Sequence, residues 1–262
     1  MTESDDRIFE IGLSAADKIR ARLAEVVIPR TEVERFLPLI YFFVRSYKSY
    51  AALRLLWTNG YVEDAHTLAR TIYELCLQAD FIARDIETRS IQFAESLFAT
   101  ALEYYRRLSP EQAERGKPIA EELEQWRKEF RISKGLPEEP CKYQVNWWGP
   151  GGVKRLVEAL NLPLADEYET IYFMLSDHVH SSVSLVHRYA IRDKGSLSLN
   201  FNPERSHNLT VPYSTSGWLL RIGRRVSDAV GLGLEKELEE AAVKLNSVAR
   251  PAAEVSGLKA KS

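Results

Sequence analysis

The sequence predicts an all-α protein, a multi-helix bundle with one small β-hairpin excursion near residues 190–212. Most of the chain repeats apolar residues at helical spacing, and start and stop signals of helices separate these repeats. Strict alternation occurs in one short stretch, residues 196–201, after an Asp193-Lys-Gly195 turn, and residues 208–211 are the expected partner strand. Because no further strand pattern repeats along the chain, a doubly wound sheet or a barrel is excluded.

Five helices are expected in the N-terminal half of the chain. Their approximate ranges are 4–26, 31–57, 62–85, 88–108 and 110–131. Thr31 and Glu34 form the capping box expected at the start of the second helix, and Asn59-Gly60 provides its left-handed end. Ser109 caps the fifth helix, with a proline at its first position and Gln112 at the box position. Because the fifth helix is charged on most faces, we expect it to lie outermost.

The C-terminal half begins with the longest irregular stretch, residues 132–152, which contains Trp147-Trp148. We expect the two tryptophans to pack on the bundle as a lid, with a base-stacking platform as the alternative. Helices are expected at 153–160, 165–189, 215–232 and 235–248. The predicted domain organisation is an amphipathic N-terminal helix (1–30), a single helical-bundle domain (31–249) and a flexible tail (250–262).

The composition excludes several classes of function. The 262 residues carry a formal net charge of −2, which gives no global attraction to nucleic acid or to an anionic membrane. The most apolar run, residues 37–44, is far shorter than the ~20 residues that span a bilayer. The acidic N-terminus lacks the pattern of a signal peptide. Two cysteines, Cys76 and Cys141, form neither a disulfide framework nor a thiolate zinc site. We therefore expect a soluble cytoplasmic protein without a membrane partner.

The third predicted helix carries charges where an all-helical core is expected to bury carbon. Its apolar residues lie around nearly the whole circumference, which is typical of a helix at the centre of a bundle. Arg70 and Glu74 occupy the narrow remaining strip, in line with His66 one turn earlier. Buried charge is costly unless it is paired, so each partner needs further hydrogen bonds. These residues indicate either an internal polar clamp between helices or a binding site.

The helix expected at 165–189 carries a second polar motif that includes Ser176, His178 and His180. At about 100° per residue, Ser176 and His180 share one flank of this helix, and His178 lies on the other. Positions two apart point about 160° from each other, so the two histidines cannot share one metal ion. A helical zinc pair needs i,i+4 spacing. The pattern therefore predicts neither a metal site nor a cofactor.

At these two motifs the sequence resembles the domain-of-unknown-function 5677 family. Members carry an Arg-Thr/Ser-x-x-Glu helix after a glycine turn and an alanine-rich start, similar to Gly60–Ala65 followed by Arg70-Thr-Ile-Tyr-Glu74. A later Tyr-x-x-Leu-Ser-x-x-Val-His signature matches Tyr172–His180. The resemblance spans roughly residues 35–190 and implies a mostly helical bacterial domain without an assigned reaction. By residue, it singles out Arg70, Glu74, Ser176 and His180.

A looser likeness connects the chain to the HEPN helical ribonucleases of toxin and phage-defence systems. Those enzymes use an Arg and a His on one helix, four to six residues apart. Here Arg70 follows His66, and Arg188 follows His180 and His187, so that catalytic motif is absent as written. A nuclease would need a rearranged site.

Three hypotheses follow for the function. The first is a binding or regulatory module, in a stress or phage-defence setting, whose Arg70, Ser176 and His180 hold a small anionic ligand or a partner. The second is a metal-independent ribonuclease or toxin, in which Arg70 binds an anion, Glu74 orients or deprotonates His180, and His180 acts as general acid or base. The third is a purely structural bundle that forms a homo-oligomer and uses the polar network to specify packing.

Overall fold

The computed structural model describes residues 3–137, 146–149, 151–179, 190–193, 196–199 and 209–255. Its helical elements are α1 (Glu3–Glu25), α2 (Val33–Thr58), α3 (Val62–Ala83), α4 (Ile86–Arg106), α5 (Pro110–Ser133), α6 (Gly152–Ala159), η1 (Ala165–Tyr172), α7 (Phe173–Val179), α9 (Thr210–Val230) and α10 (Glu235–Val255). Two four-residue strands, β1 (Ala190–Asp193) and β2 (Ser196–Leu199), pair antiparallel. The predicted all-α class is confirmed.

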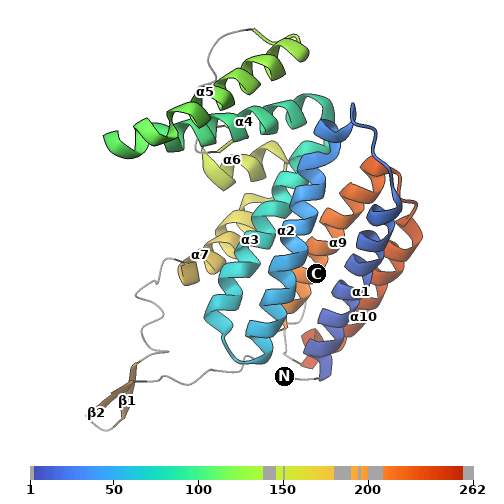
Figure 1. Cartoon of the computed structure of the whole chain (residues 1–262). Coiled ribbons are helices and arrows are strands. Elements are labelled where there is room, and N and C mark those ends of the chain that lie inside the picture. The colour runs from blue at the N-terminus through green and yellow to red at the C-terminus, as the bar shows by residue number, and fades with distance from the viewer. Residues whose placement is uncertain are drawn as a thin grey trace.

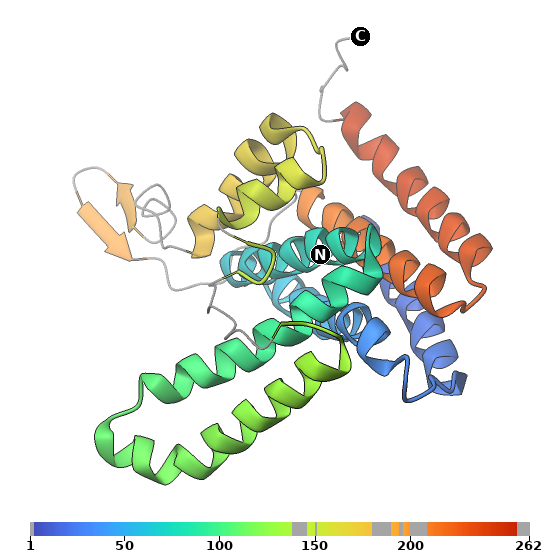
Figure 2. The same cartoon turned by 90° about the horizontal axis from the view of Figure 1, so that it is seen from above.

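Helix α3 lies at the centre of the bundle. It packs against α2, α4, α6, α7 and α9, and both views place it in the middle of the molecule (Figures 1 and 2). Most of the circumference of α3 is buried, for example at Ala69, Tyr73 and Ile82, and the strip that carries Arg70 and Glu74 is partly exposed. This arrangement confirms the central position predicted from the apolar circumference of the helix, and it explains why the charges on α3 need partners within the fold.

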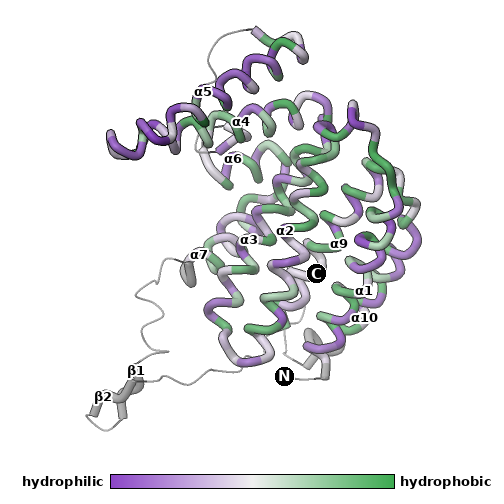
Figure 3. The backbone as a smooth tube through the Cα atoms, in the orientation of Figure 1, coloured by the Kyte–Doolittle hydropathy of each residue, from purple (hydrophilic) through white to green (hydrophobic). Residues whose placement is uncertain are grey.

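Helices α1, α2, α3, α9 and α10 run along one another, whereas α4 and α5 cross the end of the bundle and project from it as an arm (Figures 1 and 2). Helix α5 lies on the outside of α4 and is hydrophilic along most of its length, as predicted (Figure 3). The Ser109 cap of α5 has the predicted capping box with Gln112. Among the described residues, none of the helices is long and apolar enough to cross a membrane.

Several local predictions were wrong. Helix α2 begins at Val33 after Glu32, whose side chain makes no capping hydrogen bond, so Thr31 and Glu34 do not form the expected capping box. Strand β2 pairs with residues 190–193. The expected partner strand at 208–211 is not a strand where it is described, because α9 already begins at Thr210. Helix α10 continues to Val255, past the predicted end, and residues 256–262 of the predicted tail lie outside the described residues.

The element before α7 differs from the α-helix that was expected there. Residues Ala165–Tyr172 form a π-helix, and Thr170 Oγ1 donates to the carbonyl oxygen of Ala165, five residues earlier, at 2.7 Å. A π-helix turns less per residue than an α-helix does, so side chains after it are rotated relative to a continuous α-helix. Positions on η1 and α7 therefore cannot be aligned by 100° steps across Tyr172.

Candidate functional site

Arg70 lies where α3 faces η1 and α7, and its guanidinium has defined partners on both sides. Nε donates to Glu74 Oε1 at 2.9 Å, one turn along α3. Nη2 donates to the hydroxyl of Tyr172 at 2.6 Å, and Cζ lies 4.7 Å from the centroid of that ring. The side chains of Arg70 and Glu74 are 17% and 29% exposed. The predicted pair is thus present, half-buried, and tied to a second helical segment.

Tyr172 and Tyr73 connect the pair to the π-helical turn. Their ring centroids are 6.5 Å apart, and Tyr172 also stacks on Tyr168 at 5.2 Å. The Tyr73 hydroxyl lies 2.9 Å from Oε2 and 3.0 Å from the backbone oxygen of Glu167. Burial raises the pKa of the Tyr172 phenol; the negative charge of Glu74 adds to this and the positive charge of Arg70 opposes it. The contacts of Tyr172 with Arg70 and of Tyr73 with Glu167 hold η1 against α3.

Ser176 lies one turn after Tyr172, on α7, and its hydroxyl donates to the carbonyl oxygen of Tyr172 at 2.6 Å. Such a bond to the preceding turn occupies the hydroxyl proton and leaves the oxygen able to accept. His180 lies outside the described residues, and the side chain of His178 does too. The structure therefore brings Arg70 and Glu74 together and places Tyr172 beside them, while the position of His180 stays a prediction. We call Arg70, Glu74, Tyr172 and Ser176 the α3–α7 site.

A second charged cluster, which the sequence reasoning missed, joins α3 to α9. Asp80 is 3% exposed, and its Oδ1 accepts from Nε of Arg225 at 2.7 Å. Its Oδ2 pairs with Nη2 of Arg221. We call these three residues the Asp80 cluster. The sequence could have indicated Asp80 in the same way as Arg70, because both are charged residues on a helix with apolar residues around nearly its whole circumference. A buried carboxylate on such a helix needs cationic partners.

Cys76 lies one turn before Asp80 on α3. It is 1% exposed, and burial raises the pKa of its thiol above the usual range, with the charge of Asp80 adding to the effect. A buried neutral thiol is a poor nucleophile. The interpretation of Cys76 as a small buried hydrophobe is confirmed.

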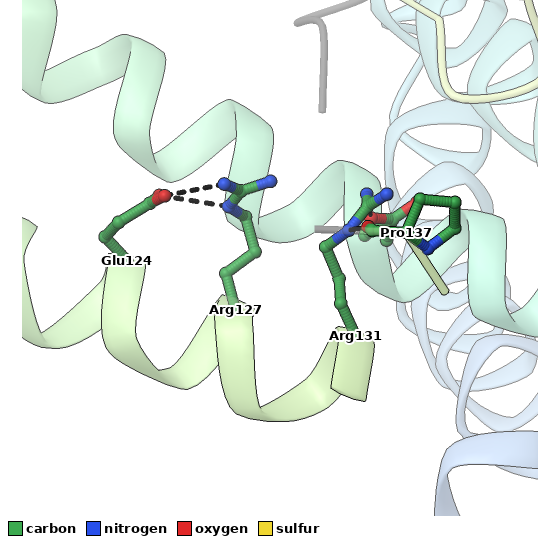
Figure 4. A network of polar contacts seen from close by, with 5 residues as sticks. Glu124, Arg127, Arg131 and Pro137 are labelled. Atoms are coloured by element: carbon green, nitrogen blue, oxygen red, sulfur yellow. Dashed lines mark hydrogen bonds and ion pairs between the residues drawn. The ribbon is translucent and has the colours of Figure 1, made fainter. Parts of the chain in front are cut away.

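A third charged cluster lies on α5 in the arm, and one of its ion pairs crosses to α4 (Figure 4). Arg127 is 4% exposed and makes two hydrogen bonds to the carboxylate of Glu124, at 2.6 and 3.0 Å. Nε of Arg131 donates to the backbone oxygen of Pro137 at 2.6 Å, and Nη1 pairs with Glu95 on α4. Because α5 is charged on most of its faces, the sequence pattern did not show which arginines would be buried. Arginine is rarely buried without such partners. These contacts serve the packing of the arm.

Trp147 packs on the bundle, as the lid interpretation predicts. Its ring contacts the aromatic side chains of Phe42, Phe81 and Phe93, with centroids 5.3 to 6.5 Å apart, and its Nε1 donates to Gln78 Oε1 at 2.7 Å. These contacts favour the lid over a base-stacking platform. Among the described residues, no group of three or more His, Cys, Asp or Glu side chains is placed to hold a metal ion.

The comparisons with known proteins agree with the two sequence motifs. A model of DUF5677, a family of unknown function, matches residues 36–197, which is more than half of the chain. The chain belongs to this family. No curated protein and no solved structure matches the chain. The DUF5677 region contains the whole α3–α7 site and Asp80, but it ends before α9 and α10. The looser likeness to HEPN domains is not shown by these comparisons.

Proposed function

We propose that the protein is a binding module whose α3–α7 site takes a small anionic ligand, with Arg70, Ser176 and His180 as its contacts. The observation that carries the proposal is the guanidinium of Arg70, which is oriented by Glu74 and Tyr172 and remains 17% exposed. An Arg fork recognises phosphate and carboxylate groups by parallel hydrogen bonds. Because the side chain is already ordered, binding costs less conformational entropy.

The π-helical turn adds support for a site at this place. π-helical turns are rare and are frequently found at functional sites. Here the turn ends at Tyr172, the residue that contacts Arg70, and it is held to α3 by the Tyr73–Glu167 contacts. A clamp with a structural role alone would be served equally well by an ordinary α-helical turn, so the π geometry favours a site.

The test is a titration of the full chain with inorganic phosphate and with adenosine monophosphate, monitored by thermal unfolding. A ligand that binds only the folded state raises the Tm by mass action. We expect both probes to raise the Tm of the wild type, and Arg70→Lys to lose most of this shift, because a lysine keeps the charge and lacks the planar fork. Comparing shifts, and not absolute Tm values, removes any effect of the substitution on the ligand-free protein.

Arg115→Lys is the matched control. Arg115 also forms an i,i+4 pair, with Glu111 at 2.7 Å, but both side chains are 78% exposed on the surface of α5. This variant should keep the full wild-type shift. Equal shifts in Arg70→Lys and wild type, or no shift with either probe, would contradict the proposal and favour the structural clamp.

The same site allows a direct test of the enzymatic alternative, an RNA-cleaving activity with His180 as general acid or base and Glu74 as its partner. Wild type, Arg70→Ala and His180→Ala are compared in an RNA-cleavage assay and in a toxicity assay. Loss of cleavage in both folded variants would make the module an enzyme. Equal activity in all three proteins would contradict this enzymatic role.

A further inference from the structure

A groove of about 410 Å³ lies between α9 and α10, outside the region that matches the family model. Its floor is apolar and includes the buried side chains of Leu220, Leu238 and Leu245. Trp218 forms part of its wall and packs on Tyr73 of α3, with ring centroids 5.0 Å apart. An apolar concavity of this size with a few polar groups is typical of small-molecule sites.

Two contacts bridge the helices on either side of the groove. The Tyr213 hydroxyl donates to Asn246 Oδ1 at 2.6 Å, and Nη1 of Arg224 pairs with Glu239 at 3.3 Å. On α9 the two bridging residues are eleven positions apart, about 16 Å at 1.5 Å per residue. A compact ligand fits between the bridges.

Gly217 lines the groove between the bridges, and the packing of the bundle does not explain why this residue is a glycine. A Cβ built at Gly217 would meet no atom within 4 Å. The contrast is Gly223 on the same helix, where a Cβ would overlap Cδ1 of Ile19. A glycine inside a helix costs stability relative to alanine. At Gly223 close helix packing requires that cost, whereas at Gly217 its effect is to leave the backbone open to the groove.

The charged groups of the lining are two arginines and one glutamate, which favours an anion. Arg224 and Glu239 are 51% and 65% exposed, and an exposed pair of this kind is weak enough for Arg224 to change partner. Arg221 also lines the groove and forms an ion pair with the buried Asp80. This pair orders the Arg221 guanidinium at the edge of the groove.

We propose that the α9–α10 groove binds a flat, mainly apolar small molecule that carries one anionic group. Its apolar body lies over Gly217 and against Trp218, and its anionic group lies between Arg221 and Arg224. This site is separate from the α3–α7 site, and the proposal does not depend on the function suggested for that site.

The test uses anilinonaphthalene sulfonate, a flat aromatic anion whose fluorescence rises in an apolar site, with phenylnaphthylamine as its uncharged analogue. The folded wild type should bind the sulfonate saturably at one site. Gly217→Phe should weaken this binding about tenfold or more, because the new ring occupies the groove. Gly217→Leu should have a smaller effect in the same direction. Neither variant should lower the Tm, since the helix gains propensity and no atom lies within 4 Å of the added Cβ.

Two controls separate the parts of the proposal. Val243 is 60% exposed on α10 and outside the groove lining, so Val243→Phe should bind the sulfonate as the wild type does. Arg224→Gln should weaken binding of the sulfonate several-fold and leave that of the uncharged amine unchanged. The proposal is overturned if Gly217→Phe and Val243→Phe bind equally well, if the folded wild type shows no saturable binding, or if Arg224→Gln affects both probes alike.

Discussion

Asp80 on α3 and Arg225 on α9 join the two best-buried helices of the bundle, with Oδ1 of the carboxylate 2.7 Å from Nε of the guanidinium. The carboxylate is almost completely buried, whereas the side chains of Arg225 and Arg221 are 38% and 37% exposed. The negative charge is therefore inside the protein and the positive charges reach it from the surface. This geometry allows arginine stems to pack against apolar groups while their charged ends keep some solvent.

Replacing Asp80 by Asn should destabilise the fold strongly. The substitution leaves two guanidinium groups beside each other without the carboxylate that offsets their charge, and removal of one partner of a buried pair costs about 3 kcal/mol. The free energy of unfolding, measured by urea titration, checks this. Asp228→Asn, at an exposed position of α9, is the control and should change stability by less than about 0.5 kcal/mol. Equal stability of the two variants would show that the Asp80 cluster contributes nothing to the fold.

Arg70→Ala should cost more stability than Arg115→Ala, although both arginines belong to i,i+4 pairs with glutamate. Arg70 also bonds to Tyr172 on the neighbouring segment, and loss of hydrogen bonds to a charged, half-buried group costs about 2 kcal/mol. The exposed pair of Arg115 is worth only about 0.3 kcal/mol. Urea titrations of both variants measure the difference. A similar small loss in both would mean that the Arg70 contacts do not hold α3 and η1 together.

The order of the helices and the central place of α3 could be predicted from the sequence because each depends on local pattern. The i,i+4 spacing of Arg70 and Glu74 fixed their mutual contact in the same way. The partner Tyr172 could not be predicted as a contact, since it depends on the π-helical turn, and no period of apolar residues distinguishes that turn. The cationic partners of Asp80 could not be predicted either. They lie on a helix more than 140 residues later in the chain, and only the packing of α3 against α9 brings them together.

Alkaline pH should destabilise the protein above about pH 10, and Tyr50 should account for part of this loss. Tyr50 is fully buried, and burial raises the pKa of its phenol well above the usual value of 10, while the hydrogen bond with Ser216 and the charge of Arg54 oppose the shift. The folded state then holds the phenolic proton more tightly than the unfolded state does. Stability is therefore full below pH 10 and falls as the pH rises, by at most about 1.4 kcal/mol per pH unit for one group.

Urea titrations of the wild type and Tyr50→Phe between pH 8 and pH 11 check this expectation. The variant should be less stable at pH 8, by about 1 kcal/mol for the lost hydrogen bond to Ser216, and should lose less stability as the pH rises. Tyr104→Phe, at a 64% exposed position, should follow the wild-type curve. Parallel curves for Tyr50→Phe and the wild type would contradict the assignment.

Gly223→Ala should destabilise the bundle although alanine is the better helix former. The added methyl group would overlap Cδ1 of Ile19, which is 1% exposed at the contact between α1 and α9, and overpacking of this kind costs about 1 to 3 kcal/mol. Ile19→Val removes the overlapped atom and alone costs about 1 kcal/mol. The double variant should therefore lose less stability than the two single losses added together.

Gly217→Ala, where no atom lies within 4 Å of the added Cβ, should instead raise stability by up to about 1 kcal/mol. Additive losses in the double variant would show that α1 and α9 adjust to the extra volume elsewhere.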